Sequence, residues 1–191
     1  SRRGLLTVTG VARGALVVAT AGQTFSPLSS LSVLSPRQPD VGPQGLPVNK
    51  TARAAGTLAV ANYLLTVVGD QSRTFTLADL QAMPQTTVNL PITCVEGWSV
   101  KAAWTGVRVR DLLDLAGVPH GHRILVDSLE EHGSYRSSVL DRGHARHEHT
   151  LLALKVHGDQ LALDHGFPAR LISPDRPGVL QTKWVRRLSA L

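Results

Sequence analysis

Cysteine is nearly absent from the sequence. Cys94 is the single cysteine among 191 residues, which excludes an internal disulfide and any zinc site built from cysteine pairs. The thiol is therefore either a buried spectator, as free cysteines usually are, or a functional thiolate. Its neighbours in the sequence have to decide between the two.

Aromatic residues are also scarce, at 4% of the chain, whereas 17 glycines and 11 prolines are present. This composition favours a loop-rich fold of short strands over a helical bundle. With 191 residues and 42% hydrophobic content, the chain suits one main core with appendages.

Acidic residues are outnumbered, with 14 Asp and Glu against 20 Lys and Arg, which gives a formal charge of +6. Such a charge suits an anionic ligand, a nucleic acid or an acidic membrane surface. The basic residues are scattered and do not alternate with aromatic residues, so we do not expect nucleic-acid binding.

Residues 1–21 have the pattern of a targeting segment. Arg2 and Arg3 precede a mostly apolar run, and Ala19-Thr20-Ala21 has the small-x-small form of a cleavage site. The pattern resembles a twin-arginine export signal, although Arg13 interrupts the run, and a membrane segment or an amphipathic helix are alternatives. We expect an extracytoplasmic protein, periplasmic or at the outer face of the cytoplasmic membrane, either anchored or free.

The rest of the chain divides into a connector and a compact domain. Residues 22–57 are rich in Pro, Ser and Gly, which predicts an extended connector. Within residues 58–191 we predict strands at 63–68, 87–93, 123–128, 151–156, 160–163, 169–172 and 184–188. A capping box at 76–79 predicts a short helix ending before Pro84, and a second helix is expected at 110–116. Without a regular βαβ rhythm, the fold class is α+β with mixed or antiparallel sheets.

Chemistry is concentrated at the segment CVEGWS, residues 94–99. It places a thiol where a predicted strand ends and side chains can point into a cleft. A thiolate is a soft ligand for a redox metal, and with no second cysteine or suitably spaced histidine the other ligands must come from outside the protein. His144, His147 and His149 lie in the polar run 141–150, which we expect to be a solvated loop rather than a metal site.

Three separated motifs resemble the catalytic domain of the sulfite oxidase superfamily. They are CVEGWS at 94–99 followed by WTGV at 104–107 and RDLL at 110–113, then DHGFPARL at 164–171, then QTKWV at 181–185. The CVE-x-W-S form is most similar to the molybdenum subunit of periplasmic protein-methionine-sulfoxide reductases and their actinobacterial-type relatives. The resemblance implies a sulfite-oxidase-type molybdopterin-binding fold of mixed β-sheets and short helices, and the cofactor Mo-molybdopterin.

The resemblance also implies roles for single residues. Cys94 takes the place of the catalytic cysteine that ligates the metal, and Arg170 that of the arginine that grips the cofactor phosphate, a task suited to a guanidinium. The other implied cofactor-binding residues are Asn49, Ser128, His165, Gln181, Thr182 and Lys183. Ala52 and Arg53 depart from the reductase pattern, which has an aromatic residue and an acid there.

The implied function is that of an oxidoreductase. We expect two-electron oxygen-atom transfer on a small or protein-bound S- or N-oxide substrate, with electrons from a separate membrane cytochrome or quinone-linked subunit. One alternative is a sulfite-oxidising enzyme of the same fold. Another is a cofactor-free anion-binding module, which the presence of both Cys94 and Arg170 disfavours.

Overall fold

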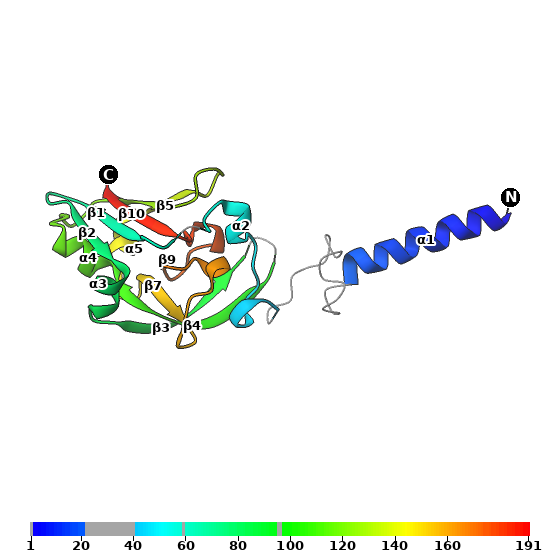
Figure 1. Ribbon diagram of the computed structural model, residues 1–191, viewed down its shortest axis with the longest axis horizontal. Coiled ribbons are helices and arrows are strands. Elements are labelled where there is room, and N and C mark those ends of the chain that lie inside the picture. The colour runs from blue at the N-terminus through cyan, green and yellow to red at the C-terminus, as the bar shows by residue number, and fades with distance from the viewer. Residues whose placement is uncertain (1, 22–40, 59, 95–96) are drawn as a thin grey trace.

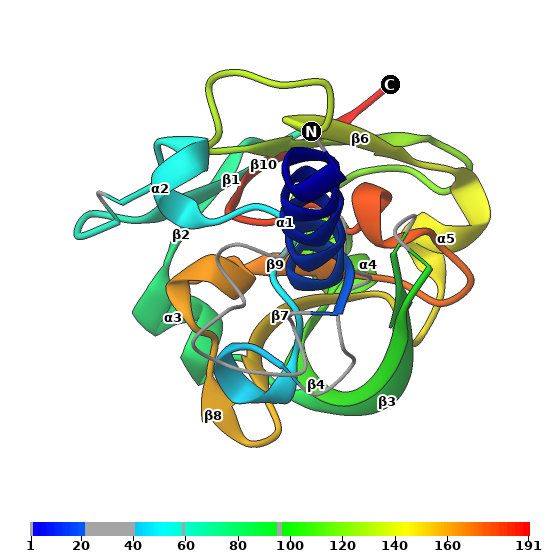
Figure 2. The ribbon, with the colours of Figure 1, turned by 90° about the vertical axis from the view of Figure 1, so that its right-hand side faces the viewer.

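The computed structural model describes residues 2–21, 41–58, 60–94 and 97–191. Its strands form two sheets, one above the other in the view of Figure 2. The first has the order β2-β1-β10-β5-β6, with β1 Leu64–Val68, β2 Arg73–Thr76, β5 Ile124–Ser128, β6 Ser137–Leu140 and β10 Val185–Ala190. The second has the order β3-β4-β7-β8, with β9 also paired to β7; its strands are β3 Thr86–Thr93, β4 Ser99–Arg108, β7 Leu151–Val156, β8 Asp159–Gln160 and β9 Arg170–Ile172.

The helices are short apart from the first (Figure 1). They are α1 Arg2–Ala21, α2 Ala52–Ala55, α3 Leu77–Ala82, α4 Val109–Leu115 and α5 Arg142–Arg146, with 3-10 helices at Pro43–Gly45, Leu163–His165 and Gly178–Leu180. Strand β1 pairs with β10 in parallel, and the other strand pairs are antiparallel. The predicted α+β class with mixed sheets is confirmed.

Local sequence explains several elements. Thr76 and Asp79 form the predicted capping box of α3: the Thr76 side chain accepts from the Asp79 N–H, and the Asp79 carboxylate accepts from the Thr76 N–H at 2.8 Å. The Thr76 hydroxyl also donates to the Asp79 carboxylate at 2.6 Å, and this bond, followed by the one from the Thr76 N–H, holds the pKa of Asp79 below its ordinary value. In β1 the inward positions Leu65 and Val67 are fully buried, as alternation along a strand requires.

Other elements differ from the prediction. Strand β4 was not predicted, because its Lys, Ala and Gly residues have low strand propensity; eight residue pairs with β3 hold it in the sheet. The strand expected at 160–163 is wrong, since β8 ends at Gln160 and the chain turns into the helix Leu163–His165. The loop expected at 141–150 contains α5, whose first turn is capped by the Asp141 carboxylate accepting from the His144 N–H.

Residues 41–57, which the sequence places in the connector, pack against the domain. Leu46, Ala52 and Ala55 are buried in its apolar clusters. The Gln44 side chain donates to the Gln160 carbonyl and accepts from the Ala162 N–H. This segment lies against the cleft described below, and the connector residues 22–40 lie outside the described residues.

Helix α1 stands separately from these clusters. Its described side chains, at residues 7–16, are all exposed. No helix in the described part of the chain combines the length and apolar character needed to cross a membrane. The export or anchoring role of residues 1–21 stays a prediction.

Candidate cofactor-binding site

Cys94 lies where β3 ends and the chain turns back into β4. Its N–H donates to the Trp98 carbonyl at 2.9 Å, and its carbonyl accepts from the Gly97 N–H at 3.1 Å. These hydrogen bonds fix the thiol in an apolar cluster that includes Ile92, Trp98 and Trp104, where Cys94 is 6% exposed. The predicted position of the thiol at a strand end is confirmed.

The thiol faces a narrow cleft with one apolar and one polar side. A cavity of about 30 Å³ is lined by Cys94 and by Leu46, Pro47, Asn49, Ile92, Trp98, Trp104, His165, Arg170, Gly178 and Lys183. A neighbouring cavity of about 100 Å³ shares Asn49, Gly178 and Lys183 and adds, among others, Lys50, Glu130, Tyr135, Gln181 and Thr182. The shared walls make the two cavities adjacent parts of one cleft.

Arg170, the first residue of β9, is held rigidly in this cleft. Its guanidinium donates to the carbonyls of His165 at 3.1 Å and Gln181 at 3.3 Å, and it stacks 5.0 Å from the centroid of the Trp104 ring. Burial lowers the pKa of Arg170 to about 9, which leaves it positively charged at neutral pH. Its Nε is buried without a hydrogen-bond partner in the described residues.

Lys183 brings three parts of the chain together. Its Nζ donates to the Lys50 carbonyl at 2.7 Å and to the Asp164 carbonyl at 2.9 Å, and it lies 4.8 Å from the centroid of the Trp184 ring. The ammonium therefore joins the N-terminal segment and the helix Leu163–His165 to the chain just before β10. With Arg170 it places two cations in the wall of one cleft.

His165 is buried in the same wall as a neutral imidazole. Burial is the largest cause that lowers its pKa from the ordinary 6.5, and the cations of Arg170 and Lys183 add to this, whereas the hydrogen bond to Pro43 opposes it. The Pro43 carbonyl lies 2.6 Å from Nε2, so Nε2 carries the proton and donates it. His165 thereby fastens the N-terminal segment across the cleft.

The remaining predicted site residues use their side chains mainly to hold neighbouring parts of the chain in place. Gln181 uses its side chain to bind both backbone groups of Ser173, and its own carbonyl accepts from Arg170. Thr182 shares a 2.7 Å hydrogen bond with the Ser138 hydroxyl. Ser128 donates to the Lys183 carbonyl at 2.7 Å and does not line either cavity, so it supports the wall from behind. The Asn49 side chain accepts from the Lys50 N–H at 2.9 Å.

Sequence reasoning missed several residues of the cleft. Lys50 forms an ion pair with Glu130, whose side chain is 7% exposed, although the two are 80 positions apart. Gly178 packs on the backbone of Thr93 and Cys94. Lys50 directly follows the predicted Asn49, but nothing in the sequence indicates the partner Glu130 or the closeness of Gly178 to Cys94.

A phosphate-bearing dithiolene cofactor fits this set of donors. The cleft offers one soft sulfur ligand, two cations, and a buried arginine nitrogen with an unused hydrogen-bond donor. Ligand pockets usually enclose about 300–1,000 Å³, so the walls around the two small cavities have to move apart to admit such a group. His144, His147 and His149 are no rival: within the described ranges no group of three or more His, Cys, Asp or Glu residues is placed to hold a metal.

Comparison with known proteins decides the family. The model of the family described as "Oxidoreductase molybdopterin binding domain" matches residues 52–191. The chain belongs to this family. Its cofactor is Mo-molybdopterin, and the predicted sulfite-oxidase-type fold and the oxidoreductase class are confirmed.

Three relatives illustrate the similarity. Sulfite oxidase of Arabidopsis thaliana is 26% identical over 165 residues, which cover 68% of this chain and 42% of the relative. The putative protein-methionine-sulfoxide reductase subunit YedZ1 of Azospira oryzae is 31% identical over 130 residues, 67% of this chain and 48% of the relative. The crystal structure of the sulfane dehydrogenase SoxCD from Paracoccus pantotrophus matches with a TM-score of 0.60 and 26% identity, covering 67% of this chain and 38% of that chain. The chain thus spans less than half the length of each of these relatives.

Proposed function

We propose that this chain is the molybdenum-binding catalytic part of an enzyme that removes an oxygen atom from a small or protein-bound S- or N-oxide. For a sulfoxide the balanced reaction takes up two electrons and two protons and releases a sulfide and water. The supporting observation is the convergence of the buried Cys94 thiol with Arg170 and Lys183 in one cleft. Mo-molybdopterin, when bound, supplies the two-electron redox chemistry.

The chain's own residues bind and orient the cofactor. Arg170 and Lys183 would hold its phosphate by charge-assisted hydrogen bonds, and Cys94 would be the protein's ligand to the metal. Neutral His165 donates a hydrogen bond and adds no charge beside the two cations. Trp98 and Trp104 form an apolar wall that excludes water from the thiol's side of the cleft.

The electrons are proposed to come from a separate haem or quinone-linked partner at the membrane, outside the cytoplasm. The twin-arginine pattern of residues 1–21 and the similarity to a protein named as a reductase subunit support this placement. Fractionation of cells that express the full chain checks the location, and recovery in the cytoplasm alone contradicts it.

Metal content and turnover test the catalytic proposal together. The protein, made in a host that synthesises the cofactor, is compared with Cys94→Ala and with the matched surface variant Lys101→Ala, which lies on exposed strand surface. We expect Cys94→Ala to lose at least about a hundredfold in sulfoxide or N-oxide reduction with an artificial donor, more than the 10–100-fold typical of supporting residues. Full molybdenum and activity in Cys94→Ala would overturn the proposal.

Sulfite oxidation is the second candidate, favoured by the similarity to the Arabidopsis thaliana sulfite oxidase. It runs in the opposite sense: sulfite and water give sulfate, two electrons and two protons. The same panel includes sulfite with a soluble electron acceptor. Turnover of sulfite alone, with none of the oxides reduced, replaces the first proposal with this one.

A further inference from the structure

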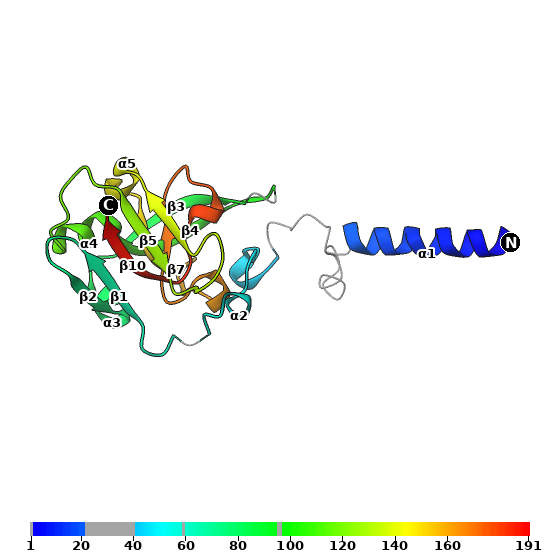
Figure 3. The same ribbon diagram turned by 90° about the horizontal axis from the view of Figure 1, so that it is seen from above.

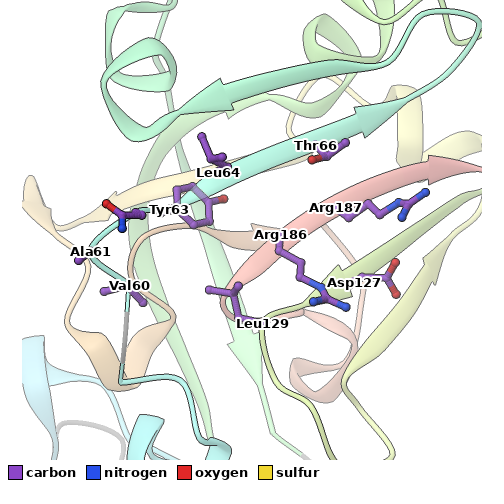
Figure 4. Close-up of a pocket in the computed structure, with 10 residues that line it drawn as sticks. Val60, Ala61, Tyr63, Leu64, Thr66, Asp127, Leu129, Arg186 and Arg187 are labelled. Atoms are coloured by element: carbon purple, nitrogen blue, oxygen red, sulfur yellow. The ribbon is translucent and has the colours of Figure 1, made fainter.

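A second hollow lies on the first sheet, outside the cofactor cleft (Figure 4). This groove of about 570 Å³ is lined by Val60, Ala61, Asn62, Tyr63, Leu64, Thr66, Asp127, Leu129, Arg186 and Arg187. Seen from above in Figure 3, no described helix crosses the strands β1, β10 and β5 that carry it. Its apolar part includes Leu64, which is 51% exposed. We call it the arginine groove.

A β-bulge places both arginines in the groove. Successive residues of a strand normally point to opposite faces, so Arg186 and Arg187 should not share one. The pairing of β10 with β5 shifts between Val185, opposite Ser128, and Arg187, opposite Asp127, which leaves Arg186 as the extra residue. Both arginines are exposed and both line the groove, as expected where a bulge redirects a side chain.

The groove has two arginines against one acidic residue, Asp127, so its formal charge is positive. None of the ion pairs found within residues 41–58, 60–94 and 97–191 involves Arg186 or Arg187. The Arg187 Nε donates to the Ser189 hydroxyl at 2.9 Å, which leaves its other N–H groups facing solvent. Arginine and tyrosine, both present in the groove, are enriched among energetically important interface residues. A partner protein that complements this groove would present an acidic surface with an apolar centre.

The groove is connected to the cofactor cleft by hydrogen bonds. Leu129 lines the groove, and its N–H donates at 2.7 Å to the carbonyl of Trp184, which lines the cleft. Tyr63, also in the groove, donates its hydroxyl proton to the Val185 carbonyl at 2.6 Å. A protein seated in the groove would therefore contact a residue that is hydrogen-bonded directly to the cleft wall.

We propose that the arginine groove is the docking surface for the acidic face of a one-electron carrier protein. The inference rests on the proposed function, which requires electrons from a separate protein. Each docking event would take one electron from the carrier. Two events, with two protons from solvent, complete the reduction of one oxide to its sulfide or amine and water.

The test compares two double charge reversals. Arg186→Glu/Arg187→Glu changes the groove, and Lys101→Glu/Lys155→Glu makes the same change of net charge on exposed positions of the second sheet. The probe is an acidic c-type cytochrome, with a basic c-type cytochrome for comparison. Binding is measured by calorimetry at low and high salt, and electron transfer from the reduced acidic cytochrome by stopped flow.

We expect the wild type to bind the acidic cytochrome at low salt and to bind it less at high salt. The groove variant should lose at least about tenfold in affinity and in bimolecular rate, and the control less than about threefold. Equal losses in both variants, no loss in the groove variant, or no binding by the wild type each overturn the proposal. Molybdenum content and turnover with a small artificial donor, measured on the same preparations, report separately on the proposed function.

Discussion

At the scale of single residues, the position of the Cys94 thiol depends on a residue with no side chain. A Cβ atom at Gly178 would lie 2.9 Å from the Thr93 carbonyl oxygen and 3.7 Å from the Cys94 Cα. The helix Gly178–Leu180 therefore packs directly on the backbone that carries the thiol. The first of these distances is shorter than real Cβ contacts, and it involves backbone atoms that cannot simply rotate away.

Gly178→Ala should therefore displace the thiol. We expect the variant to retain about tenfold less molybdenum per chain at limiting cofactor, in the range seen when supporting residues of metal sites are changed. In cofactor-free protein, the rate at which a thiol reagent modifies Cys94 should change too. The control is Gly143→Ala, whose Cβ has no neighbour closer than 3.4 Å. Equal molybdenum content and thiol reactivity in wild type and Gly178→Ala would show that Gly178 does not position the thiol.

At the scale of elements, the segment 41–50 is held across the cleft by hydrogen bonds that involve side chains and by the buried Leu46. The His165 Nε2–Pro43 bond of 2.6 Å and the two bonds of the Gln44 side chain are among them. Because the segment includes Leu46, Pro47 and Asn49 of the cleft wall, it is the part best suited to move when the cofactor enters. The Nε2–H that donates to Pro43 is present in either protonation state, but burial and the cations of Arg170 and Lys183 disfavour a charged His165 imidazolium in this position.

Stability should therefore fall as the solution is acidified through the histidine range. The folded-state pKa of His165 lies below its ordinary value of 6.5, so between these two values the unfolded chain binds more protons, and the free energy of unfolding drops with falling pH. Asp79 and Asp141, whose pKa values are lowered from 3.8, lose their contributions only at lower pH. Urea unfolding of cofactor-free protein at pH 7.5 and 5 measures the drop. It should be smaller in His165→Gln, and an identical drop in both proteins contradicts the assignment.

Elements with strong local signals were predictable from the sequence. Strand β7 begins and ends where the run Leu151–Val156 predicted, and α3 has its predicted capping box. Strand β4 was not predictable, because pairing with β3 and β7 rather than propensity holds it. The same division applies to the site. Cys94, Arg170 and Lys183 stand in motifs, whereas the Lys50–Glu130 pair and the Gly178 contact join positions about 80 residues apart and exist only after folding.

At the scale of the whole molecule, the cleft is bordered by parts of both sheets and by the N-terminal segment 41–50. Arg170 begins β9 of the second sheet, Lys183 precedes β10 of the first, and Asn49 belongs to the N-terminal segment (Figure 1). A ligand bound to all three stabilises the folded state relative to the unfolded chain, because the unfolded chain cannot assemble the site.

Loading with cofactor should accordingly raise the temperature of unfolding. At a free cofactor concentration about 100 times the Kd, the expected gain is about 2.7 kcal/mol. Calorimetric scans of protein from hosts that can and cannot synthesise molybdopterin measure this gain. Cys94→Ala, which keeps Arg170 and Lys183 but lacks the metal ligand, should gain less. Coincident scans for loaded and unloaded wild type would contradict a cofactor that bridges these segments.

The hydrogen bond from Lys183 to the Lys50 carbonyl also has a consequence for the timing of biosynthesis. It joins residues 133 positions apart, and Lys183 lies just before β10, so it is translated long after Lys50. While the ribosome is still adding the residues of β10, the stretch 181–183 is inside the exit tunnel and the cleft lacks one wall. We therefore expect cofactor insertion to begin only after residues 181–183 have left the exit tunnel.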